Sequence, residues 1–181
     1  MRIISGKLKG RRFQMPAKAT KTRPTTDYGR ESLFNILQHQ IDLQDITVLD
    51  LFSGSGAVGY EFLSRAAAKV VFIENYAACV QFIKQTLKSF DILSEAEVYK
   101  TDVFKYLSNC PPQSFDVIFA DPPYALDEMI KIPDLVFGRN ILKKEGILII
   151  EHDERHNFEN HANFAELRKY GQSIFSIFEL E

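Results

Sequence analysis

The sequence predicts an α/β fold built on a mostly parallel, seven-stranded sheet. Between residues 46 and 150, five short apolar segments alternate with four segments of helical periodicity. The apolar segments lack the polar–apolar alternation of half-exposed strands, so we expect helices to cover both of their faces. Two further segments, 164–170 and 173–180, alternate at period two around Gly171-Gln172 and predict an antiparallel hairpin that completes the sheet.

The parallel part of the sheet follows a strand–helix repeat. Strands are expected at residues 46–52, 70–73, 97–100, 115–120 and 146–150. Helices are expected at residues 58–67, 77–90, 103–107 and, as a broken helix, 127–137. A strand order of 3-2-1-4-5 would reverse direction between the first and fourth strands, and open α/β sheets bind ligands at the carboxyl ends of the strands at such a switch.

The start of the chain has a different character. Residues 1–16 predict a short β-hairpin around the turn-prone segment 6–10, and residues 17–27 are a polar linker. The linker ends in the helix-start signal Pro24-Thr25-Thr26-Asp27, after which apolar residues recur at helical spacing. A chain of 181 residues suits one domain. We therefore expect a small N-terminal extension, residues 1–27, on a main domain, residues 28–181.

Charge is distributed unevenly between these two parts. Residues 1–30 hold nine Lys and Arg against Asp27 alone, a net charge of +8, whereas the remainder holds 13 basic and 23 acidic residues, a net charge of −10. A basic arm on an acidic body is typical of proteins that contact a polyanion. A solvated tail is the equally simple alternative.

Cysteine usage and hydropathy indicate the compartment. The two cysteines, Cys79 and Cys110, lie in no CxxC pair and form no disulfide framework. The N-terminus turns basic before an apolar run can form a signal peptide, and no stretch reaches the ~18 apolar residues of a membrane helix. These features predict a reduced, cytoplasmic protein, and a monomer is the simplest assumption.

The first motif with chemical content is Asp50-Leu-Phe-Ser-Gly-Ser-Gly-Ala-Val-Gly59, which closes the first strand and opens a helix. Gly54, Gly56 and Gly59 match GxGxxG, and Glu74 ends the next strand, where an acid suits the two hydroxyls of a ribose. The pattern predicts a nucleoside-containing cofactor, and both NAD and S-adenosylmethionine fit it. A tight turn without a ligand would also explain the glycines.

The second motif is Asp121-Pro122-Pro123-Tyr124, directly after the fourth strand. Two prolines stiffen the loop and remove two backbone donors, which leaves carbonyl oxygens and the Asp121 carboxylate as acceptors. An acceptor-rich loop suits an amino group, and Tyr124 offers a flat face on which a base can stack. A rigid turn is the structural alternative.

The positions of the two loops carry more weight than either motif. With the expected strand order, both loops follow strands that flank the topological switch, so they would face one another across one crevice. An NAD-dependent dehydrogenase would need a hydride-handling His, Tyr or Lys there, and the sequence offers no strong candidate.

Two weaker patterns remain. Asp102 and Val103 follow the third strand and could contact an adenine, although an Asp at such a place is more often a helix N-cap. Glu151-His152-Asp153, with His156 and His161 nearby, resembles a metal cluster, but the irregular spacing favours a solvated loop, so no metal site is expected. His152 follows the fifth strand and is a candidate for substrate contact.

At these residues the chain resembles a known family, the bacterial small-subunit ribosomal RNA guanine-N2 methyltransferases of the D type, within the class I methyltransferase superfamily. The resemblance spans nearly the whole chain. Asp-Pro-Pro-Tyr alone is shared with adenine-N6 and cytosine-N4 enzymes. Two small departures are Ala66, where the family usually has Gly, and Asn75, where a charged residue is common. The motifs that carry the resemblance are residues 2–10, Arg23-Pro24-Thr25-Thr26-Asp27, residues 33–37, the two loops, Glu151-His152 and Lys169-Tyr170-Gly171.

The resemblance implies a Rossmann-like methyltransferase fold and S-adenosylmethionine as cofactor. It implies that Asp121, Pro122, Pro123 and Tyr124 are catalytic, with Asp121 and the Pro122 carbonyl holding a guanine amine and Tyr124 stacking on the base. Gly54, Ser55 and Gly56 would bracket the methionine part, Glu74 would bind the ribose, and Asp102 and Val103 would lie at the adenine. The remaining cofactor contacts would be Asp50, Phe52, Ser53, Asn75 and Asp121.

The implied partner is small-subunit ribosomal RNA, on a partly assembled particle. The basic arm would contact phosphates through Arg2, Lys7, Lys9, Arg11 and Arg12, and Arg23 would reach either RNA or the cofactor carboxylate. Three alternatives stay open at this point: an adenine-N6 or cytosine-N4 methyltransferase, an NAD-dependent oxidoreductase, and a non-catalytic RNA-binding assembly module.

Overall fold

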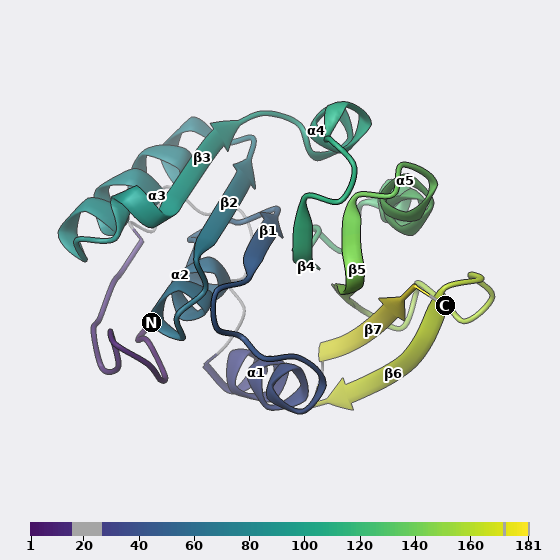
Figure 1. Cartoon of the computed structure of the whole chain (residues 1–181), viewed down its shortest axis with the longest axis horizontal. Helices are drawn as coiled ribbons and strands as arrows, with labels where there is room; N and C mark the ends of the chain where they lie inside the picture. Colours follow the sequence, from purple (N-terminus) through teal and green to yellow (C-terminus); the bar gives the residue numbers. More distant parts are fainter. Residues whose placement is uncertain (16–26, 172, 181) are drawn as a thin grey trace.

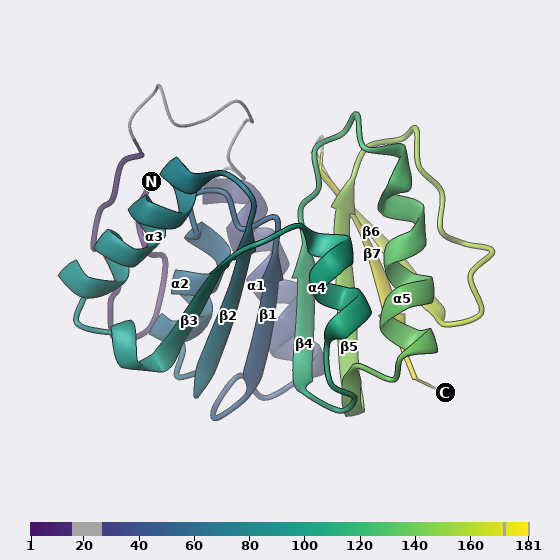
Figure 2. The ribbon, with the colours of Figure 1, turned by 90° about the horizontal axis from the view of Figure 1, so that it is seen from above.

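A computed structural model describes residues 1–15, 27–171 and 173–180. The predicted linker and helix-start signal, including Arg23, lie mostly outside these described residues. Figures 1 and 2 show a single twisted sheet with helices on both sides. The strands are β1 (Thr47–Leu51), β2 (Lys69–Glu74), β3 (Ala96–Lys100), β4 (Phe115–Ala120), β5 (Leu142–His152), β6 (Phe164–Tyr170) and β7 (Ser173–Glu179). The helices are α1 (Asp27–Gln40), α2 (Ala57–Ser64), α3 (Ala77–Ser89), α4 (Val103–Asn109) and α5 (Ile132–Gly138), with short 3₁₀ turns η2 (Leu93–Glu95) and η3 (Asp127–Lys131).

The sheet has the order β3-β2-β1-β4-β5-β7-β6. The predicted 3-2-1-4-5 order is confirmed, and the topological switch lies between β1 and β4. Strands β1 to β5 are parallel, whereas β7 pairs antiparallel with both β5 and β6. The expected C-terminal hairpin is present, with its second strand inserted next to β5.

The apolar strands are explained by two cores, one on each face of the sheet. Neighbouring strand residues alternate between them: Val48 packs with α1, α2 and α3, whereas Leu49 packs with α4 and α5. In Figure 2, α4 and α5 lie in front of the sheet while α1 and α2 lie behind it. Because both faces are buried, both must be apolar, and the period-two alternation of a half-exposed strand is lost.

Strand β5 differs from its prediction, which began at Gly146. It starts at Leu142 and passes through polar residues before its buried part, and its register with β4 shifts between Phe115 and Val117. This polar start contains Lys143, which pairs with Asp116 at 2.7 Å. The charged residues at the start of β5 give no apolar signal, so the prediction from hydropathy placed the start of the strand too late.

The N-terminal segment folds back on itself as expected, but its two arms meet in one antiparallel bridge, Arg2 to Arg12, rather than in regular strands. Some backbone N–H groups donate across the hairpin, as from Ile3 to the Arg11 carbonyl at 2.9 Å, whereas others bind the body of the protein. The N–H groups of Ile4 and Ser5 donate to the two carboxylate oxygens of Glu61 in α2, at 2.8 and 2.9 Å. The apolar side chains of the segment, Ile3, Leu8 and Phe13, are buried in the core beside α1, α2 and α3.

Among the described residues, no helix is both long and apolar enough to cross a membrane.

Candidate active site

The glycine loop, residues 50–59, connects the end of β1 to the start of α2 at the topological switch. Gly56 caps α2 with φ 78°, in the left-handed region that favours glycine. Glycine is required at position 59 by packing, because a Cβ there would lie 2.1 Å from the ring of Phe72 on β2. Gly54 is open, since a Cβ would meet its nearest atom at 3.8 Å. The first glycine therefore borders free space, and the last fixes helix-to-sheet packing.

Glu74 lies across from this loop at the end of β2 and is 7% exposed. One carboxylate oxygen accepts from the Gly54 N–H and the other from the Tyr76 N–H, both at 2.8 Å. Each oxygen retains further acceptor capacity. Two backbone donors thus hold the carboxylate in a fixed orientation beside the open glycine, as the ribose-binding prediction requires.

Asp50 lies beneath the same loop, is 2% exposed and accepts from the Gly59 N–H at 3.2 Å. Burial raises the pKa of its carboxyl group well above the usual range, and the negative charges of Asp121 and Glu74 add to this effect. Ser53 is also buried and donates its hydroxyl to the Asp50 carbonyl at 2.6 Å. Asp50 and Ser53 therefore shape the loop from inside, and Asp50 lies close enough to Asp121 and Glu74 for their charges to act on it.

The Asp-Pro-Pro-Tyr loop, residues 121–124, follows β4 on the other side of the switch. The Asp121 N–H donates to the Leu51 carbonyl at 3.5 Å, which attaches the loop to the end of β1. The Pro123 carbonyl accepts from the Leu126 N–H at 2.8 Å and the Tyr124 carbonyl accepts from the Arg155 guanidinium at 2.9 Å. These two carbonyls hold the loop in shape, while the Tyr124 side chain is 43% exposed and presents its ring outward.

Glu151 lies near the carboxyl end of β5, the strand beside β4. Ala120 of β4 pairs with Ile150 of β5 in the parallel register. The next residues, Asp121 and Glu151, therefore lie at the same level of the sheet. Glu151 is 3% exposed and accepts from the Ser173 hydroxyl at 2.7 Å. Burial, with a contribution from the Asp121 charge, raises its pKa to about 8. The sequence marked Glu151 only within a group of His and carboxylate residues and within the motif Glu151-His152, because burial in a sheet leaves no sequence signal for a single Glu.

His152 does not fit the predicted substrate contact. It is 1% exposed, and its ring nitrogens lie 2.8 Å from the Asp153 carbonyl and 2.7 Å from the Ser176 hydroxyl. Burial lowers its pKa, which favours the neutral ring. The contact with Ser176 connects β5 to β7, so His152 supports the sheet beneath the site. Among the described residues, no group of three or more His, Cys, Asp or Glu could hold a metal ion.

Asp102 and Val103 follow β3, as the sequence indicates. The Asp102 side chain accepts from the Lys105 N–H at 2.9 Å, so it is the N-cap of α4. Val103 is buried in the core between the sheet and α4. Asn75 is exposed directly after Glu74. Their proposed contacts with an adenine or ribose remain predictions.

The basic arm lies against α2 and α3, not away from the body. The Lys7 ammonium pairs with Glu95 at 2.6 Å, and the Arg11 guanidinium donates to the Ser89 carbonyl and lies 5.4 Å from the centre of the Phe90 ring. Arg2 lies 3.7 Å from Asp27. Lys9 and Arg12 are exposed, and the Met1 sulfur is 3.7 Å from the Ser55 hydroxyl. The arm is thus attached to the body next to the glycine loop.

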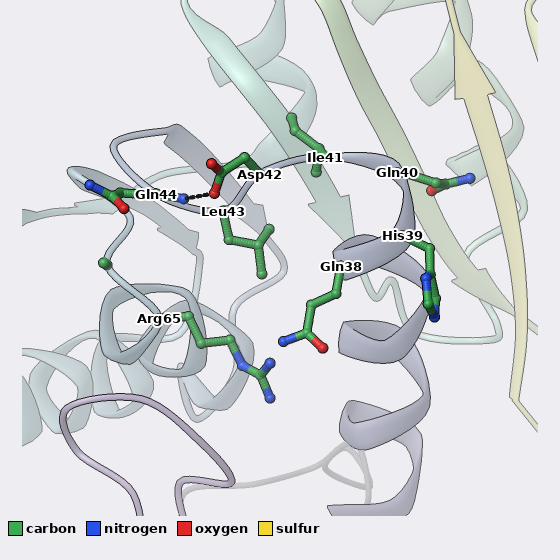
Figure 3. A pocket seen from close by; sticks show the side chains of 9 residues that line it. Gln38, His39, Gln40, Ile41, Asp42, Leu43, Gln44 and Arg65 are labelled. Carbon is green, nitrogen blue, oxygen red and sulfur yellow. Dashed lines mark hydrogen bonds between the residues drawn. The ribbon is translucent and has the colours of Figure 1, made fainter.

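A hollow of about 580 Å³ lies at the end of the sheet opposite the two loops. It is bordered by the end of α1, the turn into β1 and Arg65 (Figure 3). This is the amino end of β1, whereas ligands of open α/β sheets bind at the carboxyl ends. Arg65 is already paired with Glu61 at 2.9 Å and stacked over Phe34. The hollow is therefore not the active-site candidate.

Comparison with known proteins gives a consistent family. The family model described as "Conserved hypothetical protein 95" matches residues 1–179. The protein named ribosomal RNA small subunit methyltransferase D of Escherichia coli (strain K12) is 32% identical over 187 residues, covering 100% of this chain and 90% of the relative. Its namesake in Buchnera aphidicola subsp. Baizongia pistaciae is 35% identical over 158 residues, covering 87% of this chain and 78% of the relative.

The fold agrees with these matches. The solved structure of the Escherichia coli protein yhhF has a TM-score of 0.85 and 30% identity, and the match covers 100% of this chain and 98% of that one. With the family model matched over almost the full length and relatives above 30% identity, the chain belongs to this family, whose curated relatives are named ribosomal RNA small subunit methyltransferase D.

Proposed function

We propose that this protein transfers a methyl group from S-adenosylmethionine to N2 of a guanine in small-subunit ribosomal RNA. That it is an rRNA methyltransferase using this donor follows from the family and its named relatives. The observation that carries the proposed site is the attachment of the Asp-Pro-Pro-Tyr loop to the end of β1, through the Asp121 N–H and the Leu51 carbonyl. This contact brings the amine-binding loop beside the glycine loop.

The glycine-loop side of the site fits the cofactor. Glu74 is oriented by two backbone donors toward a loop with open space at Gly54, which suits a ribose diol. Ser55 and Gly56 would contact the methionine part, and Asn75, Asp102 and Val103 the nucleoside. The charges of Glu74 and Asp121 both act on the buried Asp50 of this loop, and negative charge at these two acids suits a positively charged sulfonium. When bound, S-adenosylmethionine supplies a methyl group already activated for transfer.

The residues on the opposite side would hold the acceptor. Asp121 and the Pro122 carbonyl accept hydrogen bonds from the amine and orient its nitrogen in line with the methyl carbon and the sulfur. They stabilise the positive charge that develops as the N–C bond forms and the C–S bond breaks. The proton then passes to Asp121 or to water. Tyr124, with its exposed ring, stacks on the base once it leaves the RNA stack.

RNA binding would involve the N-terminal extension, residues 1–27. The exposed cations Lys9 and Arg12 are the first proposed phosphate contacts, with Arg2, Lys7, Arg11 and Arg23 as further candidates. Lys7 and Arg11 are also attached to Glu95 and Ser89, so they fix the arm to the body. A partly assembled ribosomal particle is the proposed substrate and the cytoplasm the proposed location. A monomer is sufficient, because the residues proposed here lie on one chain.

The direct test is methyl transfer from labelled S-adenosylmethionine to ribosomal RNA and to small-subunit particles, followed by nucleoside mass spectrometry. N2-methylguanine is expected. N6-methyladenine or N4-methylcytosine as the labelled product would refute the base assignment while leaving the reaction class intact.

The remaining alternatives are separated by binding measurements on the same protein. Calorimetry should show S-adenosylmethionine binding and no comparable NAD binding. RNA binding without label transfer, under conditions where the cofactor binds, would instead support a non-catalytic assembly module.

A further inference from the structure

Glu151 is a buried acid for which the proposed mechanism has no use. Its side chain lies at the end of β5, between the level of Asp121 after β4 and Ser173 on β7. One carboxyl oxygen accepts from the Ser173 hydroxyl at 2.7 Å. The other oxygen is buried and has no hydrogen-bond partner among the described residues. A buried polar atom without a partner, one strand away from the proposed amine-binding group, calls for a physical explanation.

The surroundings of Glu151 disfavour its ionised form. A carboxylate that keeps one oxygen buried and unpaired gives up hydration without replacing it. The neighbouring Asp121 adds a negative charge, and two carboxyl groups that share a site do not both ionise readily. The Ser173 hydrogen bond acts in the opposite direction but is outweighed, and the pKa of Glu151 rises to about 8. At neutral pH, its carboxyl group is therefore mostly protonated.

Asp121 is surrounded differently. It is half-buried at the mouth of the site, and its charge acts on both Asp50 and Glu151, which are each at least 97% covered. Burial raises the pKa of both of these neighbours. Asp121 is the most exposed of these three acids, so it can carry a negative charge at the lowest cost in desolvation.

We propose that Glu151 is a positioning residue for the methyl transfer: its buried carboxyl group stays neutral and so leaves the negative charge at the site's mouth to Asp121, which holds the acceptor amine. Ionisation of Glu151 would place a second charge behind Asp121, push that carboxylate out of position and lower the rate. This inference rests on the proposed function for its kinetic consequence, whereas the neutral state of Glu151 is testable without cofactor or RNA.

The first experiment measures thermal stability against pH for the protein alone, as wild type and Glu151→Gln, which copies the neutral acid. The folded pKa of Glu151 lies above its unfolded value, so wild type is stabilised at low pH and loses that contribution between about pH 4.5 and pH 8. The Tm of Glu151→Gln minus that of wild type should rise across this window and level off above it. A flat difference would show that Glu151 titrates normally and would overturn the proposal.

The second experiment measures kcat and KM for RNA between pH 6.5 and pH 9.5 in wild type, Glu151→Gln and Ser173→Ala. Wild-type kcat should fall above pH 8, approaching about tenfold per pH unit as the ionised form accumulates. Glu151→Gln should keep kcat within about threefold at pH 7 and lack this fall. Ser173→Ala removes the donor that favours ionisation, so its fall should move to higher pH. Titration of the RNA itself is common to all three proteins and cancels.

The outcomes separate the two proposals. Loss of kcat in Glu151→Gln at pH 7, with S-adenosylmethionine binding intact, would show that the ionised form is needed and would refute the positioning role. Identical pH profiles in wild type and Glu151→Gln would reduce Glu151 to a structural residue. If wild type transfers no methyl group to RNA, the proposed function fails, and the stability experiment still decides the state of Glu151.

Discussion

The glycine loop and the Asp-Pro-Pro-Tyr loop follow adjacent strands of one sheet, yet they are held in different ways. The glycine loop is fixed by buried groups of the neighbouring strand β2: Gly59 lies against Phe72, and the buried Glu74 accepts a hydrogen bond from the Gly54 N–H. The Asp-Pro-Pro-Tyr loop is held on its exposed side by Arg155, which donates to the Tyr124 carbonyl, and its tyrosine is exposed. A cofactor of constant shape suits a rigid cradle, whereas a base drawn out of RNA suits a loop that can adjust.

The largest expected effect is on the exposed side. Asp121→Ala removes the acceptor that stabilises charge on the amine, and methyl transfer should fall by about 10²–10³-fold. RNA affinity should change little, since the arm is untouched, and the assay uses saturating cofactor because Asp121 is also a proposed cofactor contact. Single-turnover assays with calorimetry test this. Activity near the wild-type level would remove the catalytic role assigned to Asp121.

The next effect should appear on the rigid side and concern folding. A methyl group added in Gly59→Ala would lie 2.1 Å from the Phe72 ring, so the free energy of unfolding should fall by about 1–3 kcal/mol. Gly138→Ala is a matched control because a Cβ there meets nothing within 4 Å. Denaturant unfolding measures both, and equal stability of the two variants would contradict this account of the loop.

Arg155→Ala sharpens the comparison further. It removes the hydrogen bond to the Tyr124 carbonyl, and an exposed contact of this kind is worth about 1 kcal/mol, so kcat should fall several-fold with the fold intact. Arg168→Ala, which removes a similarly exposed guanidinium paired with Glu166 on β6, serves as control. Equal kcat values in the two variants would show that the hydrogen bond from Arg155 to the Tyr124 carbonyl does not hold the catalytic loop in position.

The smallest effect should come from the basic arm. Replacing Lys9 or Arg12 by Ala should weaken RNA binding about uniformly across sequences and reduce the salt slope by about one for each phosphate that is no longer neutralised. Lys131, an exposed residue paired with Glu128 on η3, supplies the control substitution. RNA titrations at several salt concentrations measure the slope, and unchanged slopes would place the RNA elsewhere.

The strand–helix repeat could be predicted because the central parallel strands bury both faces, which leaves mainly apolar runs such as residues 46–52. Element ends were less accurate, as β5 shows, since a polar strand start paired through Lys143 and Asp116 has no apolar signal. The N-terminal arm was predicted as a hairpin and does fold back on itself, but the N–H groups of Ile4 and Ser5 bind Glu61, a residue 57 positions away from Ile4. A buried Glu in a helix is indistinguishable from a solvated one in sequence alone.

The sequence by itself determined the parallel sheet, the two loops at its topological switch and the family to which the motifs belong, because these depend on local periodicity and on residue types that few other structures require. The tertiary structure decided which acids are exposed and which are covered. Asp121 and Glu151 are both carboxylic acids at strand ends, yet burial raises the pKa of Glu151 to about 8 while Asp121 lies half-buried at the mouth of the site. Desolvation depends on what packs around a group from distant parts of the chain, and no local pattern encodes it.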